Sequence, residues 1–87
     1  MKIKKNFILR EVAGTYLVVA VGDAVKDFNK AINLNSTGAF LWKQLQVDLT
    51  EEELIGKLLE EYEIDRETAK KDILGFIQRL REANLLE

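Results

Sequence analysis

The hydrophobic pattern divides the 87-residue chain into an extended first part and a helical second part, with the change near Asn35. Before this residue, β-branched and aromatic residues dominate the sequence. After it, apolar residues recur at three- and four-residue intervals. The first composition is typical of strands and the second spacing of amphipathic helices, so the chain predicts an α+β fold in which a sheet precedes the helices.

Three strands are expected in the first part. Residues 7–12 and 15–21 are extended runs on either side of Ala13-Gly14, which is typical of an antiparallel hairpin. The second run is apolar on both faces, so we expect one face of the sheet to be covered and the other to be partly exposed. After a looser connection over residues 22–29, residues 30–34 alternate polar and apolar side chains. This third strand joins the sheet last, and we expect it at an edge.

Three helices are predicted in the second part, over residues 36–46, 51–62 and 66–83. Thr50 and Glu53 form a capping box at the start of the middle helix. The other two helices begin after residues suited to an N-cap, which are Asn35 or Ser36 and then Asp65. The apolar stripe of the last helix consists of Ala69, Ile73, Phe76, Ile77 and Leu80.

A chain of this length supports one hydrophobic core, so residues 1–87 are expected to form one domain. Its order of elements predicts a winged-helix-like outline, with a three-stranded antiparallel sheet followed by a three-helix bundle. Asn84 suits a left-handed C-cap of the last helix, after which Leu85-Leu86 is expected to fold back onto the core.

The composition argues against several classes of function. The chain has no cysteine and no histidine, so a disulfide framework, a thiolate nucleophile and the commonest metal ligand and general base are excluded. We therefore expect no enzyme activity, no catalytic residue, no cofactor and no metal. The net charge of −2 is unfavourable for a nucleic-acid partner. The apolar runs are too short for a membrane span, and a cytoplasmic location is expected.

Residues 28–42, FNKAINLNSTGAFLW, resemble the signature of the PqqD-like family. The capping box at Thr50, the run from Leu58 to Tyr62 and the terminal Leu85-Leu86 also fall where this family has similar residues. So does Asp72, together with Phe76 and Leu80. The resemblance covers essentially the whole chain. Two departures are Lys30, where many relatives carry a small residue, and the absence of proline in the second strand.

The resemblance implies a non-catalytic module that binds the leader of a ribosomally made precursor peptide and presents it to a modifying enzyme, often a radical-SAM protein. The leader would pair as an extra strand with the third strand and lie against the third helix. Backbone pairing of this kind is a known route to peptide affinity. An open strand edge also allows a homodimer.

The residues expected to contact the peptide come from those two elements. No proline interrupts residues 30–34, so every backbone donor there is available to a guest strand. On the helix, an exposed flank at three- and four-residue spacing is predicted to form the other wall. The expected peptide-binding residues are Lys30, Ala31, Ile32, Asn33, Leu34, Lys70, Ile73, Leu74, Ile77 and Arg81.

Two alternatives remain open at this point. A winged-helix DNA-binding regulator would use the basic residues of the last helix, Arg66, Lys70, Lys71, Arg79 and Arg81, for phosphate contacts. Acidic residues on the same helix nearly cancel that charge. The other alternative is a scaffold subunit of an enzyme complex, which would bind the enzyme without the peptide.

Overall fold

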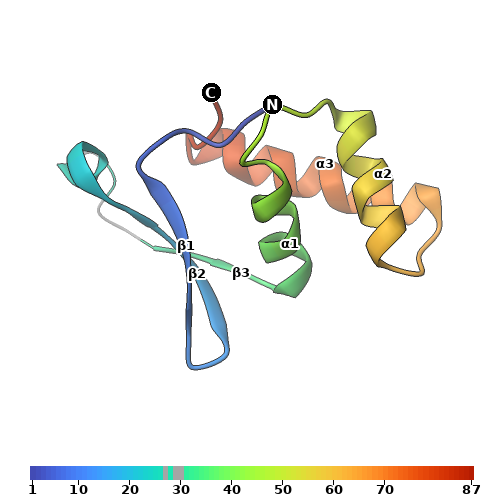
Figure 1. Ribbon diagram of the computed structural model, residues 1–87, viewed down its shortest axis with the longest axis horizontal. Coiled ribbons are helices and arrows are strands. Elements are labelled where there is room, and N and C mark those ends of the chain that lie inside the picture. The colour runs from blue at the N-terminus through green and yellow to red at the C-terminus, as the bar shows by residue number, and fades with distance from the viewer. Residues whose placement is uncertain (27, 29–30) are drawn as a thin grey trace.

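The computed structural model describes residues 1–26, 28 and 31–87. A three-stranded antiparallel sheet is followed by three helices, which confirms the expected α+β fold (Figure 1). The strands are β1 (Phe7–Val12), β2 (Thr15–Ala20) and β3 (Ile32–Leu34). The helices are α1 (Ser36–Gln44), α2 (Glu51–Glu61) and α3 (Arg66–Glu82), and a 3₁₀ helix η1 (Gly22–Lys26) follows β2.

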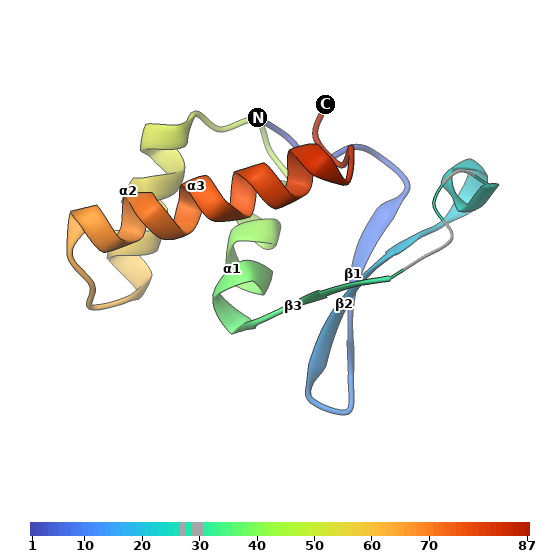
Figure 2. The ribbon, with the colours of Figure 1, turned by 180° about the vertical axis from the view of Figure 1, so that it is seen from behind.

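The hairpin of β1 and β2 closes through a two-residue loop, as expected. Val12 pairs with Thr15, and the loop residues Ala13 and Gly14 have φ angles of 51° and 79°. Two consecutive positive φ angles are required by a type I′ turn, whose twist matches that of the paired strands. The hairpin extends away from the helices (Figures 1 and 2).

The third strand is shorter than the sequence predicted. Strand β3 pairs antiparallel with β2 only over Ile32 to Leu34, so Ala31 lies before the strand. Lys30, which was also expected in it, lies outside the described residues. Among the described residues, the pair of Val18 with Ile32 is the last of this ladder, although β2 continues to Ala20. The strand order β1-β2-β3 confirms that β3 is an edge strand.

The helix caps form as predicted. The side chain of Asn35 accepts a hydrogen bond from the Gly38 amide at 2.8 Å, so Asn35 and not Ser36 is the N-cap of α1. Thr50 and Glu53 make both hydrogen bonds of the capping box. Asp65 accepts from the Thr68 amide at 2.7 Å. These bonds satisfy amides that the helices themselves leave without partners.

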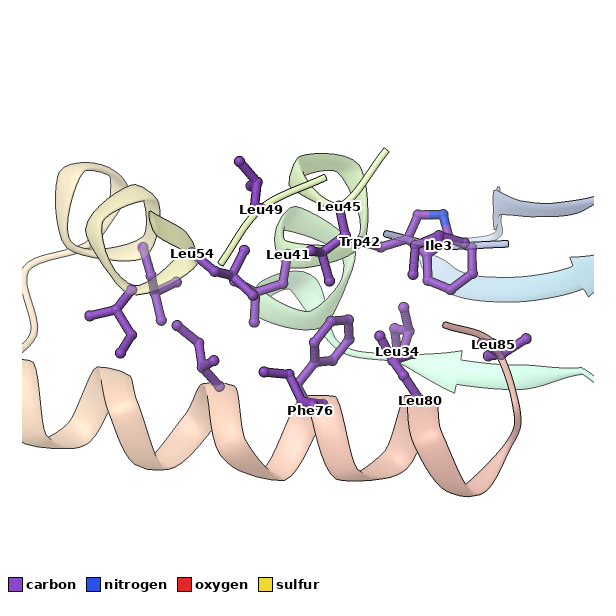
Figure 3. Packing of buried hydrophobic residues seen from close by; sticks show 14 of the residues in the cluster. Ile3, Leu34, Leu41, Trp42, Leu45, Leu49, Leu54, Phe76, Leu80 and Leu85 are labelled. Carbon is purple, nitrogen blue, oxygen red and sulfur yellow. The ribbon is translucent and has the colours of Figure 1, made fainter. Parts of the chain in front are cut away.

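The core lies between the inner face of the sheet and the three helices. In Figure 3, Leu34 from β3 lies close to Phe76 and Leu80 from α3, with Trp42 of α1 above them. All five residues of the predicted α3 stripe are buried. Leu85 folds back into the same core and is fully buried, with Asn84 before it at a φ of 59°. Packing of α3 against the sheet therefore fixes this helix next to β3.

Candidate functional site

The free edge of β3 lies beside α3. The guanidinium Nη2 of Arg79 donates a hydrogen bond to the main-chain oxygen of Asn33 at 3.0 Å. In an antiparallel pair, the backbone groups of successive residues point alternately towards the partner strand and away from it. The Asn33 carbonyl accepts its hydrogen bond from α3, which lies outside the sheet. Asn33 therefore directs its backbone groups to the free edge.

A pocket of about 210 Å³ opens between this edge and α3. We call it the edge pocket. Its lining comes from the end of β3, the first turns of α1 and one flank of α3, and consists of Leu34, Asn35, Thr37, Gly38, Leu41, Asp72, Phe76 and Arg79. Leu34, Leu41 and Phe76 are buried and give the pocket an apolar floor. Asp72 and Arg79 bring one charge of each sign to its wall.

Gly38 determines how closely α1 and β3 approach at this pocket. A Cβ atom at this position would lie 3.3 Å from the Asn35 side-chain oxygen and 3.4 Å from Cβ of Leu34. The hydrogen in place of a side chain therefore lets Asn35 reach the Gly38 amide and lets Leu34 pack beneath the helix.

The structure places the predicted strand residues as follows. Asn33 and Ala31 are exposed, Ile32 is half-buried against the core, and Leu34 is buried in the floor of the edge pocket. Lys30 is not among the described residues. Of the strand set, Asn33 thus combines an exposed side chain with a main-chain oxygen contacted from α3.

The predicted helix residues lie elsewhere on α3. Ile73 and Ile77 are 0% and 3% exposed and belong to the core. Lys70, Leu74 and Arg81 are exposed, with Leu74 at 45%, but none of them lines the edge pocket. The flank that lines it consists of Asp72, Phe76 and Arg79, at a spacing of four and then three residues.

Sequence reasoning therefore missed the flank of α3 that faces β3. A signal existed, because Asp72 and Phe76 are among the residues that resemble the PqqD-like pattern. From the sequence, Arg79 is expected only as a phosphate contact of the DNA-binding alternative. The apolar stripe defines the buried side of a helix, but either flank of that stripe can face the sheet, and the sequence does not distinguish them.

Among the described residues, neither a group of side chains that could hold a metal ion nor a membrane-spanning helix is found. Over the ranges 1–26, 28 and 31–87, acidic side chains do not gather in a group of three that could hold a metal ion. Among the same residues, no helix has the length and apolar character needed to cross a membrane.

The fold and the edge pocket define a small α+β protein with an open strand edge next to a helix. The chain belongs to the PqqD family, because the family model described as "Coenzyme PQQ synthesis protein D (PqqD)" matches residues 8–86. No curated protein matches the chain.

Two solved structures share the fold. One, described as "TbiB1 in Complex with the TbiA(beta) Leader Peptide", has a TM-score of 0.77 and 23% identity, and the match covers 100% of this chain and 95% of that one. The other, described as "Lasso peptide synthetase B1 complexed with the leader peptide", has a TM-score of 0.74 and 19% identity, with 99% and 95% covered. At these identities the likeness establishes the fold.

Proposed function

We propose that this chain is a non-catalytic module that binds the leader of a ribosomally made precursor peptide by strand addition at β3. The observation that carries the proposal is the free edge at Asn33 next to the edge pocket. A guest strand on that edge would pair with the backbone of Asn33 and place a side chain in the pocket against α3. Both structural neighbours are described as complexes with leader peptides, which supports the same use of this fold.

The guest has to compete with Arg79 for the Asn33 carbonyl. The guanidinium group occupies this acceptor in the free chain. A guest amide that takes the acceptor releases Arg79, which then lies at the wall of the edge pocket near the side chains of the guest. Net affinity therefore depends on what the guest offers in the pocket as well as on backbone pairing.

We propose that the wall of α3 that touches the guest consists of Asp72, Phe76 and the aliphatic part of Arg79. The residues indicated by the sequence, Lys70, Leu74 and Arg81, lie outside the edge pocket. Leu74→Asp is then expected to leave peptide affinity unchanged. Weakened binding by this variant would restore the contact set that the sequence indicated.

Family membership supports a proposal about the partner enzyme. We propose that the module presents the leader to a modifying enzyme, and the resemblance indicates a radical-SAM protein as its class. The basic residues of α3 do not favour DNA as a partner, since Glu67, Asp72 and Glu82 lie among them and Arg79 contacts β3. Homodimer formation through the same edge would compete with peptide binding.

The test uses fluorescein-labelled leaders synthesised from the short open reading frames that flank the gene for this chain. Binding is followed by fluorescence anisotropy with the wild type and with two variants of one residue, Asn33→Pro and Asn33→Ala. Proline removes the backbone amide at the edge, whereas alanine keeps it. We expect Asn33→Pro to weaken binding by about tenfold, the order of one lost hydrogen bond, and Asn33→Ala to bind as the wild type does.

Thermal unfolding of both variants verifies the fold. Proline at an outward-facing position of an edge strand removes no bond within the sheet, so both variants should remain folded. If a leader binds and Asn33→Pro does not weaken it, strand addition at β3 is excluded. If no flanking leader binds, the proposed function itself is excluded.

A further inference from the structure

A second pocket lies at the C-terminal end of α3. Its volume is about 380 Å³, and we call it the lysine pocket. The residues that matter for its chemistry are Lys4, Lys5, Asp23, Phe28, Ala83 and Asn84. The pocket thus collects the segment before β1, the 3₁₀ helix η1 and the end of α3.

The two pockets follow the same flank of α3. Asp72, Phe76 and Arg79 line the edge pocket, and Ala83, one turn beyond Arg79, lines the lysine pocket. Spacings of four, three and four residues keep these positions on one side of a helix. The wall opposite α3 also follows the chain. Leu34 of β3 lines the edge pocket, and Phe28, which precedes β3 in the sequence, lines the lysine pocket. A strand that lies along β3 and α3 and extends past Ile32 therefore leads from one pocket to the other.

Lys4 is held in place by the backbone on both sides. The amide of Ile3 donates to the Leu45 oxygen at 3.0 Å, and the amide of Lys4 donates to the Leu85 oxygen at 2.9 Å. The Lys4 ammonium group donates to the side-chain oxygen of Asn84 at 2.9 Å. The charge is thus positioned at the pocket before any ligand arrives, which lowers the entropy cost of an ion pair.

The charges of this pocket favour an anionic group. Two ammonium groups, Lys4 and Lys5, face one carboxylate, Asp23, in a protein whose net charge is −2. The side wall is apolar, because Phe28 packs edge-to-face on Phe7 with ring centroids 5.1 Å apart. An acidic side chain with a short aliphatic stem suits this combination of charge and wall.

We propose that the lysine pocket binds an aspartate or glutamate of the same leader peptide whose apolar side chain occupies the edge pocket. This inference rests on the proposed function. Phe76 and Ala83 are seven residues apart, which is about 10 Å along a helix, and Asp72 and Ala83 are about 16 Å apart. An extended guest advances about 3.3 Å per residue, so its acidic residue lies about three to five positions from its apolar anchor. In an antiparallel guest the acid follows the anchor, and in a parallel guest it precedes it.

The test is a selection from an mRNA-display library of random twelve-residue peptides against three immobilised proteins. These are the wild type, the charge-reversed variant Lys4→Glu/Lys5→Glu, and the matched control Lys57→Glu, which changes an exposed lysine of α2 outside both pockets. Thermal melts show whether the reversed variant folds, and if it does not, the exposed Lys5→Glu replaces it. We expect Asp or Glu at the predicted distance in the wild-type and control pools, and Lys or Arg there in the reversed pool.

Affinity measurements on one selected peptide give the magnitude. Lys4→Gln is expected to weaken an acid-containing peptide by about two- to fivefold, the range of a part-exposed ion pair. Replacing the acid of the peptide by its amide should cost the same factor, and the two changes together should cost no more than one of them.

The outcomes separate the lysine pocket from the strand addition at β3 on which it depends. A charge preference that reverses with the lysines supports the lysine pocket. If all three proteins select the same charge, or none, while Asn33→Pro weakens capture of the pools by about tenfold, the lysine pocket is overturned and strand addition stands. If Asn33→Pro leaves capture of the pools unchanged, strand addition fails, and this inference fails with it.

Discussion

Arg79 and Asn33 determine how the open edge of the sheet is presented to a partner. The Arg79 guanidinium group lies 3.0 Å from a main-chain oxygen of a three-residue strand. Exposed strand edges promote pairing between unrelated chains, and proteins commonly protect them with charged side chains. Arg79 gives this protection to the free protein while remaining displaceable, because its bond is solvent-exposed.

The competition between Arg79 and the guest leads to a prediction. Arg79→Met keeps the aliphatic part of the side chain and removes the group that occupies the Asn33 carbonyl. We expect a leader peptide that binds at β3 to bind about two- to fivefold more tightly, since it no longer has to displace a hydrogen bond. Fluorescence anisotropy measures the change. The matched control is Arg81→Met, which lies outside the edge pocket and should have no effect. A loss of affinity in Arg79→Met would mean that the guanidinium group binds the guest directly.

The buried stripe of α3 could be predicted from the sequence, whereas the flank facing β3 could not. Ile73, Phe76 and Ile77 are buried as their spacing indicated. Exposed Leu74 suggested that its flank was functional, but helical periodicity contains no information on which side the sheet lies. That side depends on how the chain returns from α2, and this is a property of the whole fold.

The signals that start the helices are local and do not depend on how the chain returns from α2. They can therefore be predicted from the sequence. The capping box at Thr50 and the N-cap at Asp65 need only neighbouring residues, and both form. The structure starts β3 at Ile32, later than the alternation predicts, because a strand exists only where it has a partner. Alternation around Ala31 continues in the sequence, but the pairing with β2 ends at Ile32.

Glycines inside the helices give a prediction on stability. A Cβ at Gly56 of α2 would meet no atom within 4 Å apart from its chain neighbours and the backbone of its own helix, so Gly56→Ala is expected to increase the free energy of unfolding by about 0.5–1 kcal/mol through helix propensity. Gly38→Ala in α1 should gain less or lose stability, because its Cβ would crowd Asn35 and Leu34. Urea unfolding of the two variants provides the comparison. Equal gains would show that the close approach at Gly38 is not required.

The N-cap of α3 predicts a dependence on pH. Hydrogen bonds from Thr68 lower the pKa of the Asp65 carboxyl below its ordinary value of 3.8. Because the folded-state pKa is the lower one, the stabilisation is complete above the unfolded-state value and is lost as the pH falls through the folded-state value. The urea midpoint should therefore fall as the pH is lowered through the unfolded-state value of 3.8 and on through the lower folded-state value. Asp65→Asn keeps a capping oxygen without the titration, so this variant should show a smaller fall. An identical fall would exclude Asp65 as a contributor.

The two ends of the chain are joined to each other by hydrogen bonds. Glu87 donates its amide to the Lys2 oxygen at 2.8 Å, and Ile3 forms a bridge with Leu86 (Figure 1 shows the ends side by side). Leu49 donates to the Met1 oxygen at 2.9 Å. The segment before β1 thus lies between the connection from α1 to α2 and the C-terminal residues. This arrangement brings Ile3 into the hydrophobic core and also fixes the backbone that carries Lys4.

The burial of Leu85 makes the last residues part of the core. Leu85→Ala is expected to lower the free energy of unfolding by about 2–5 kcal/mol, because it opens a cavity at a fully buried position. This is a large share of the roughly 4–13 kcal/mol expected for a domain of this size. Leu86→Ala, at a half-buried neighbour, should cost less. Denaturant unfolding compares the two, and equal losses would contradict the role assigned to Leu85.

The brevity of β3 has a consequence for discrimination between peptides. Three residues with alternating orientation leave very few main-chain groups for an incoming segment. Main-chain pairing is nearly indifferent to sequence, so a long edge would hold many unrelated extended segments. Main-chain pairing with β3 therefore contributes little binding free energy that all peptides share. Most of the difference in affinity between a cognate and a foreign peptide has to come from contacts of its side chains in the pockets along α3. Changes in those cavities should therefore alter which peptides are accepted without requiring any change in the sheet.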